Sequence, residues 1–216
     1  MSSMKMVLLG PPGSGKGTRA HIISELYGIP VVTTGDMLRE AVREQTTYGK
    51  EAKAYMDRGD LVPNKIVNGI VKQRMSRPDV ANGFILDGFP RSKEQADALD
   101  EILKELGTKL THVLLVVLPD DIIIQRLSKR RSCPKCGSVY HLESAPPEKE
   151  GVCNTCGTKL EQRDDDKEEV IKHRLEVYKE STEPLIKRYR DKGLIIETSG
   201  QVPMDELRDH LKKLLG

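Results

Sequence analysis

The residues best suited to chemistry lie in a glycine-rich loop at positions 10–18, which reads Gly-Pro-Pro-Gly-Ser-Gly-Lys-Gly-Thr. The loop follows an apolar run at 4–9 and precedes a segment, 16–27, whose apolar residues have helical spacing. Glycines let backbone N–H groups turn toward an anion, the start of a helix adds partial positive charge, and the lysine adds a mobile cation. The pattern predicts a triphosphate cradle formed by Gly13, Ser14, Gly15, Lys16, Gly17 and Thr18.

The end of this loop departs from the generic phosphate-loop pattern, which places Ser or Thr directly after the lysine. Here Gly17 intervenes before Thr18, so direct ligation of magnesium by Thr18 is only weakly indicated. The alternative interpretation of the whole stretch is a turn that merely joins a strand to a helix.

Charged residues elsewhere could grip a polyanion. Arg126 and Arg130 are four residues apart in a segment, 120–131, that is expected to be helical, so both would lie on one helix face. A solvated helix face is the alternative. Arg91 and Asp87 follow an apolar run at 84–86 and would leave the carboxyl end of a strand, where ligands of parallel sheets bind. For Asp87 the alternative is a turn or capping carboxylate.

The four cysteines form two tight pairs, Cys133/Cys136 and Cys153/Cys156, each followed by glycine and separated by 16 residues. This spacing favours two knuckles of one zinc site, and four thiolates leave no open position on the metal, so the role would be structural. Two disulfides, four free thiols or an iron site are the alternatives. The surrounding insert has little apolar content, and zinc would supply the missing stability.

Composition excludes several classes of protein. The 216 residues include 35 Lys and Arg against 33 Asp and Glu, a net charge of +2, which argues against a polybasic nucleic-acid coat. The longest aliphatic run, 113–118, is far shorter than the roughly 20 residues of a membrane-spanning helix. No export segment is visible, so we expect a cytoplasmic protein without membrane partners. With no Trp and 2 Phe, the core must be aliphatic.

Short apolar runs alternate with amphipathic segments along the chain, which predicts an α/β fold with a mostly parallel sheet and right-handed crossovers. Two stretches break the alternation: 33–62 is helical without a strand of its own, and 132–166 has neither periodicity. We expect both to be inserts. Strands are predicted at 4–9, 31–32, 84–86, 111–118 and 194–196, and helices at 16–27, 36–45, 50–57, from 63, 92–106, 120–131 and 204–215. Capping boxes are expected at Thr33/Asp36 and, as one reading, at Ser92/Gln95.

Four stretches in order, 10–18, 34–39, 87–91 and 163–166, together resemble adenylate kinases of the long form with a zinc-bearing lid. The resemblance covers essentially the whole chain, and the Gly17-Thr18 ending is the variant that this family uses. It implies a P-loop NTPase-like core with helices on both faces of the sheet, and reversible Mg²⁺-dependent phosphoryl transfer from ATP to AMP giving two ADP. It also implies three domains: a core of 1–32, 63–131 and 167–216, an AMP-binding insert at 33–62 and a zinc-binding lid at 132–166.

The resemblance also implies roles for individual residues. Asp87 would orient magnesium through water, Arg126 and Arg130 would bind donor phosphates, and Arg163 and Arg174 would bridge donor and acceptor. Arg39 and Arg91 would hold the AMP phosphate, with Thr34 and Gln95 near the adenine. Further ATP contacts are expected at Val139, Tyr140 and Val202, and further AMP contacts at Gly59, Asp60, Leu61, Val62, Gly88, Phe89 and Pro90.

Other functions remain open from the sequence. A kinase for another nucleoside monophosphate, or an AMP kinase using GTP, would share these motifs. A zinc-ribbon nucleic-acid-binding ATPase is the alternative from a different class, but near-zero net charge and few aromatic residues disfavour it. We expect a monomer that binds no nucleic acid. No general base is required, because the AMP phosphate is already anionic, and His21, His112, His141, His173 and His210 show no partner pattern.

Overall fold

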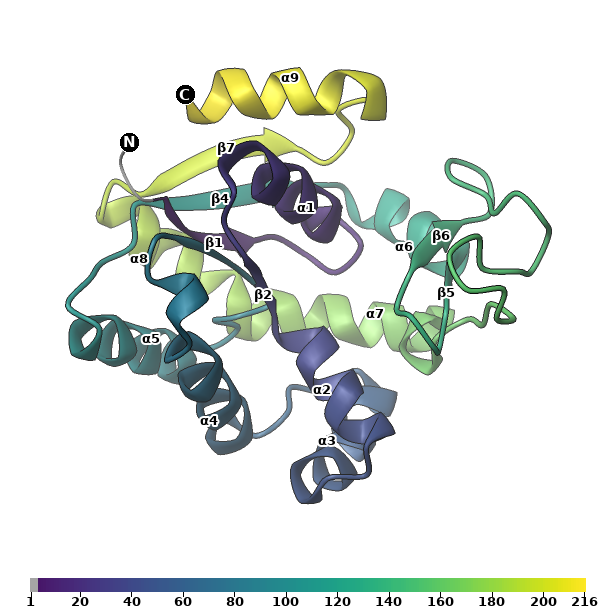
Figure 1. The fold of residues 1–216 in the computed structure, drawn as a ribbon, viewed down its shortest axis with the longest axis horizontal. Coiled ribbons are helices and arrows are strands. Elements are labelled where there is room, and N and C mark those ends of the chain that lie inside the picture. Colours follow the sequence, from purple (N-terminus) through teal and green to yellow (C-terminus); the bar gives the residue numbers. More distant parts are fainter. Residues whose placement is uncertain (1–3) are drawn as a thin grey trace.

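The computed structural model describes residues 4–216. The predicted core domain includes residues 1–3, which lie outside the described residues. Within residues 4–216, five parallel strands form the central sheet in the order β2-β3-β1-β4-β7 (Figure 1). The parallel pairing, with helices between successive strands, confirms the predicted α/β class. The strands are β1 (Lys5–Leu9), β2 (Val31–Thr33), β3 (Phe84–Asp87), β4 (His112–Val117) and β7 (Ile195–Ser199).

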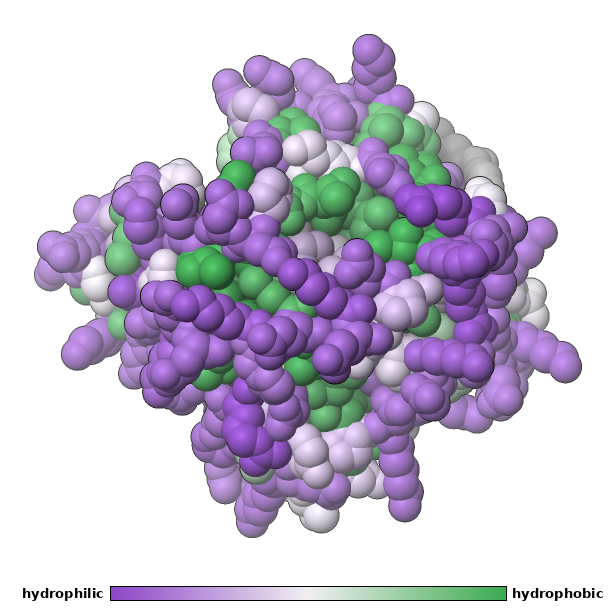
Figure 2. Space-filling model, turned by 180° about the vertical axis from the view of Figure 1, so that it is seen from behind, coloured by the Kyte–Doolittle hydropathy of each residue, from purple (hydrophilic) through white to green (hydrophobic). Residues whose placement is uncertain are grey.

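Helices cover both faces of this sheet (Figure 1). One face packs against α4 (Asn64–Met75), α5 (Lys93–Glu105) and α8 (Pro184–Asp191). The other packs against α1 (Lys16–Tyr27) and α9 (Met204–Leu215). Seen from behind, the surface is largely hydrophilic, with hydrophobic side chains gathered in separate patches (Figure 2). Most buried apolar residues therefore lie in the two layers between the sheet and its helices, and they are mainly aliphatic, as the composition predicts.

Two helices, α2 (Thr34–Arg43) and α3 (Thr47–Arg58), project from the carboxyl end of β2 (Figure 1). The predicted capping box at Thr33 is wrong, because the Thr33 side chain makes no capping hydrogen bond and α2 begins directly from the strand. Thr46 caps α3 instead, accepting from Gly49 N at 3.0 Å. A Cβ on Gly49 would lie 2.0 Å from the carbonyl oxygen of Ala41, so only glycine allows the two helices to pack this closely.

The helix predicted at 120–131 is shorter in the structure. Helix α6 (Asp120–Ser128) ends three residues early, and the chain continues as β5 (Arg130–Ser132), antiparallel to β6 (Val139–His141). Backbone pairing of Ser132 with Glu161, at 2.8 and 3.0 Å, extends this small sheet. Long-range pairing therefore outweighs the local helical pattern, and Arg126 and Arg130 do not share a helix face.

The segment between the lid and the last strand holds helices that the sequence analysis did not predict. Helix α7 (Glu168–Val177) is followed by a π-helical turn (Tyr178–Thr182) and α8. Ile171 and Leu175, four residues apart and buried, were the available signal. Short 3₁₀ turns lie at Pro78–Val80 and Asp164–Asp166. Among residues 4–216, no helix has both the length and the apolar character needed to cross a bilayer.

Candidate active site

The glycine-rich loop lies where β1 ends and α1 begins, as the motif requires. Lys16, the first residue of α1, curls back so that its Nζ donates to the carbonyl oxygens of Gly10 and Pro11, both at 2.7 Å. A Cβ on Gly10 would lie 2.4 Å from the carbonyl oxygen of Val116, and Gly15 has a φ of +91°, a region that favours glycine. The loop thus packs closely against the sheet, and the Lys16 side chain lies against the loop's own backbone carbonyls.

The electrostatics of this loop favour an anion. Burial lowers the pKa of Lys16 to about 8, and the nearby guanidinium groups of Arg91, Arg174 and Arg130 add to the effect, while Asp87 opposes it. Burial raises the pKa of Asp87, although the cationic neighbours partly offset this. Several positive charges therefore converge on one carboxylate, and a polyanion bound there would relieve their mutual repulsion.

A second cleft opens between the sheet and the α2–α3 pair. The cleft is open to solvent on one side and is lined by residues of both the sheet end and the α2–α3 pair. Many of the residues expected at AMP converge on it, although they come from five separate elements or loops. They are Thr34, Arg39, Gly59, Asp60, Leu61, Val62, Gly88, Arg91, Gln95 and Arg174.

The carbonyl of Gly88 is the centre of the polar contacts in this cleft. Thr34 Oγ1 donates to it at 2.8 Å and Arg91 Nε at 2.9 Å. Gln95 accepts from the backbone N–H of Arg91 at 2.8 Å and donates to Asn64 Oδ1 at 2.9 Å. These bonds orient Arg91 and Gln95 toward the cleft, and Asn64 is a supporting residue that the sequence analysis missed.

Three residues expected at AMP lie outside the lining of this cleft. Phe89 is fully buried in the core, and Pro90 beside it is also buried. Arg163 donates through Nε to Ser132 Oγ at 2.7 Å, on the lid side. Burial lowers the pKa of Arg163 to about 10, and the charges of Arg39 and Arg130 contribute, so Arg163 faces the same charged space from the opposite wall.

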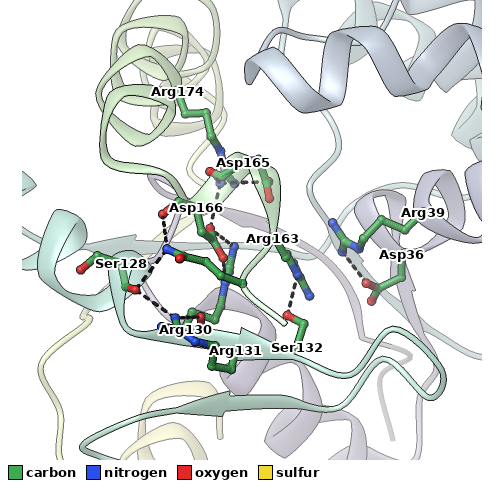
Figure 3. A network of polar contacts seen from close by, with 11 residues as sticks. Asp36, Arg39, Ser128, Arg130, Arg131, Ser132, Arg163, Asp165, Asp166 and Arg174 are labelled. Carbon is green, nitrogen blue, oxygen red and sulfur yellow. Dashed lines mark hydrogen bonds and ion pairs between the residues drawn. The ribbon is translucent and has the colours of Figure 1, made fainter. Parts of the chain in front are cut away.

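Two carboxylates hold the arginines at the root of the lid (Figure 3). Arg130 grips the fully buried Asp166 in a fork, with N–O distances of 2.7 and 2.6 Å. Arg174 Nη1 donates to the carbonyl of Asp165 at 2.7 Å and lies 3.0 Å from its carboxylate and 3.3 Å from that of Asp166. Although burial acts to raise it, the pKa of Asp165 is lowered, because Arg174, Arg130 and Arg163 outweigh burial. The sequence analysis did not predict that Asp165 and Asp166 position these arginines.

Arg126 does not contact these carboxylates; it lies near the end of β7. Its Nη1 donates to the carbonyl of Gly200 at 3.0 Å. Arg19, which the sequence analysis also missed, is almost fully buried and donates to the carbonyls of Ser199 at 2.6 Å and Gly15 at 3.3 Å. The turn that leads to Val202 is therefore joined to the phosphate loop through Arg19 and to α6 through Arg126.

The four cysteines converge as the spacing predicts. Their Sγ atoms all lie within 4.8 Å of one another, and contacts of 3.4 to 3.5 Å link Cys133 to Cys156 and Cys136 to both Cys153 and Cys156. Tetrahedral Zn–S bonds would place the sulfurs about 3.8 Å apart. A disulfide would need about 2.05 Å, so the structure favours metal ligation over disulfide pairing.

The lid residues expected to contact ATP have different environments. Val139 is exposed, whereas Tyr140 is half-buried against the cysteine cluster. The Tyr140 hydroxyl lies 3.4 Å from Cys153 Sγ and accepts from the backbone N–H of Asn154 at 2.9 Å. Its side chain thus packs against the cysteine cluster, while Val139 presents its side chain to solvent.

A phosphate loop at the carboxyl end of the central strand of a parallel sheet, beside a second arginine-lined cleft, defines a nucleoside monophosphate kinase. The family model for adenylate kinase matches residues 8–194, and the chain belongs to the adenylate kinase family. Curated adenylate kinases from Archaeoglobus fulgidus and Caldicellulosiruptor bescii are each 52% identical to it over 212 residues, covering 98% of this chain and 98% and 97% of theirs. One from Clostridium botulinum is 48% identical over 213 residues, covering 99% of each.

Proposed function

We propose that this chain transfers the terminal phosphoryl group of ATP reversibly to AMP, giving two ADP. Its family and the identity of about half of its residues to curated adenylate kinases over nearly the whole chain support this reaction. The observation that carries the proposal is that Lys16, Arg91, Arg130 and Arg174 interact electrostatically in one space, although they come from four separate elements or loops. Transfer between two nucleotides requires such a concentration of charge between donor and acceptor phosphates.

The acceptor AMP would occupy the cleft beside α2 and α3. Arg39 and Arg91 would bind its phosphate, since a guanidinium fork matches phosphate oxygens. Thr34 and Gln95 would lie near the adenine, and both side chains are held by hydrogen bonds within the cleft wall. The phosphate oxygen of AMP is already anionic, so no general base is needed.

The donor ATP would place its phosphates on the loop at 10–18, next to Lys16. Arg126, Arg130, Arg163 and Arg174 would neutralise the charge of the transferred group. Magnesium bound with ATP would supply further neutralising charge. Asp87 would hold it, because its carboxylate is buried at the end of β3 and lies 3.6 Å from a Cβ built on Gly17 of the loop. Ligation through water suits an ion that dehydrates reluctantly.

We propose that zinc is the metal at the cysteine cluster and that residues 132–166 form a lid. Four thiolates suit zinc, and the cluster offers no open position for catalysis. The lid meets the 33–62 insert directly, since Arg43 Nη1 on α2 donates to the carbonyl of Pro134 at 3.3 Å. Closure of both inserts over the remaining core would exclude water, which would otherwise compete as phosphoryl acceptor.

A coupled assay with MgATP and AMP, CMP, UMP or GMP as separate acceptors tests the proposal. We expect turnover with AMP far above that with the other three. GTP in place of ATP tests the donor base. Turnover with CMP, or ATP hydrolysis that depends on DNA and none with AMP, would overturn the assignment. The near-neutral charge supports the absence of nucleic-acid partners; the monomeric state and cytoplasmic location stay predictions.

A further inference from the structure

A contact outside the arginine cluster joins the acceptor cleft to helix α7. Asp60, which lines the cleft, directly follows the end of α3, and its Oδ1 lies 2.7 Å from Nε2 of His173. His173 is the immediate neighbour of Arg174, whose guanidinium lines the same cleft. The same helix therefore carries an arginine of the proposed transfer site and a histidine that holds the wall of the acceptor cleft.

The backbone before Asp60 rests directly on α7. Gly59 ends α3 with a φ of +82°, and a Cβ there would lie 2.6 Å from Arg174 Cγ and 3.0 Å from Val170 Cγ1. A larger residue would require the side chains of Arg174 and Val170 to shift, and the positive φ itself favours glycine. The end of the 33–62 insert thus packs against one side of α7, which is formed by Val170, His173 and Arg174.

We propose that His173 is a positioning residue for the acceptor: its imidazole, paired with Asp60, holds the cleft wall at residues 59–62 against α7 and so sets the affinity for AMP. This inference rests on the proposed function of the cleft. It gives His173 a role that is neither general base nor contact to the reacting atoms.

The charges around this pair determine the direction of its pH dependence. Asp60 also accepts from Arg58 Nε at 3.0 Å, and Glu176 Oε2 on α7 lies 3.8 Å from His173 Nδ1. The hydrogen bond to Asp60 raises the pKa of His173 above its ordinary 6.5, with burial opposing and Glu176 assisting. The hydrogen bonds from His173 and Arg58 lower the pKa of Asp60.

Because the pKa of His173 is raised, the ion pair is complete below the ordinary pKa and is lost as the pH rises through the raised value. The affinity for AMP should therefore fall at alkaline pH. Arg58 keeps its contact with Asp60 throughout, and the pair is partly exposed, so we expect a change of only about three- to fivefold in KM.

Steady-state kinetics of the full-length enzyme from about pH 6 to about pH 9 test this inference. The KM for AMP is measured in the wild type, His173→Gln, His173→Lys and Asp60→Asn at saturating ATP. We expect His173→Gln and Asp60→Asn to show the raised KM even at the acidic end. His173→Lys, whose ammonium stays charged, should keep the low KM throughout. Titration of AMP itself is common to all variants and cancels in the ratio of each variant to His173→Lys.

His21→Gln is the matched control, because His21 is an exposed histidine paired with Glu25 at 3.5 Å on α1. It should behave as the wild type, and kcat and the KM for ATP should stay unchanged in His173→Gln and His173→Lys. The inference fails if the wild type follows His173→Lys at all pH values, or if His173→Gln raises the KM for ATP as much as that for AMP. A wild type inactive with AMP would overturn the proposed function itself.

Discussion

The phosphate loop and the lid are both built on glycine-containing turns, but they are stabilised in different ways. The loop is fastened to the main core: Gly10 touches the sheet at Val116, and a Cβ on Gly13 would lie 2.7 Å from Leu127 Cγ of α6. The lid has a separate small cluster, whose buried members are Cys133, Cys153 and Leu160. Packing against the main core therefore helps to position the loop, whereas the lid has only its small cysteine cluster, where we propose a metal.

This difference fits what each region has to do. A loop packed against the parallel sheet is preorganised, so its N–H groups need no rearrangement to receive phosphates. A lid with its own small core is joined to the rest mainly through polar contacts, such as Arg130 with Asp166. Such contacts can break and reform, which would allow the proposed closure over substrates while the lid keeps its internal structure.

The largest effect is expected from the phosphate loop. Lys16→Ala removes the cation that lies over Gly10 and Pro11, and turnover should fall by a factor on the order of a thousand. The melting temperature should hardly change, because the sheet positions the loop without the lysine. Coupled-assay kinetics and thermal unfolding measure the two effects. Lys187→Ala, an exposed lysine paired with Asp191, is the control, and a loss of activity there of similar size would contradict the prediction.

A smaller loss of activity, with a clear loss of stability, is expected from the lid. Cys136→Ser removes one metal ligand, so metal content should drop and the melting temperature should fall by roughly 10 °C. Chelation of the wild-type metal should have the same effect. Elemental analysis and calorimetry measure it, with the exposed Glu150→Gln of the same lid as control. Reduced wild-type protein without any bound metal would show that the lid is stabilised in another way.

The smallest effect is expected at the junction of the two regions. Asp166→Asn keeps the shape of the side chain but removes the charge that holds Arg130 and Arg174, so kcat should fall about tenfold. The KM for AMP should change less, since Asp166 does not line the acceptor cleft. Asp164→Asn, an exposed neighbour paired with Lys167 at 3.0 Å, should leave kcat unchanged. Equal losses in both variants would refute a special role for Asp166.

Some elements were predictable because their signal is local. Helices α1 and α9 begin and end at the predicted residues, since glycine or proline marks both ends of each helix and α9 is also clearly amphipathic. The cysteine cluster was equally predictable, because the chemistry of a thiolate site restricts its spacing. Strand β5 was not, because its pairing partners in residues 139–141 and at Glu161 are distant in sequence.

For the site, the sequence alone determined the phosphate loop and the cysteine knuckles, each of which lies on short contiguous segments with restricted geometry. Which arginines meet was decided only by the tertiary structure. Arg126 binds the carbonyl of Gly200 while Arg130 binds Asp166, although the two are four residues apart. The positions of Arg19, Asp166 and His173 likewise depend on partners that are distant in the chain or belong to other elements. Such long-range electrostatic contacts follow from how the elements pack, and no local pattern encodes them.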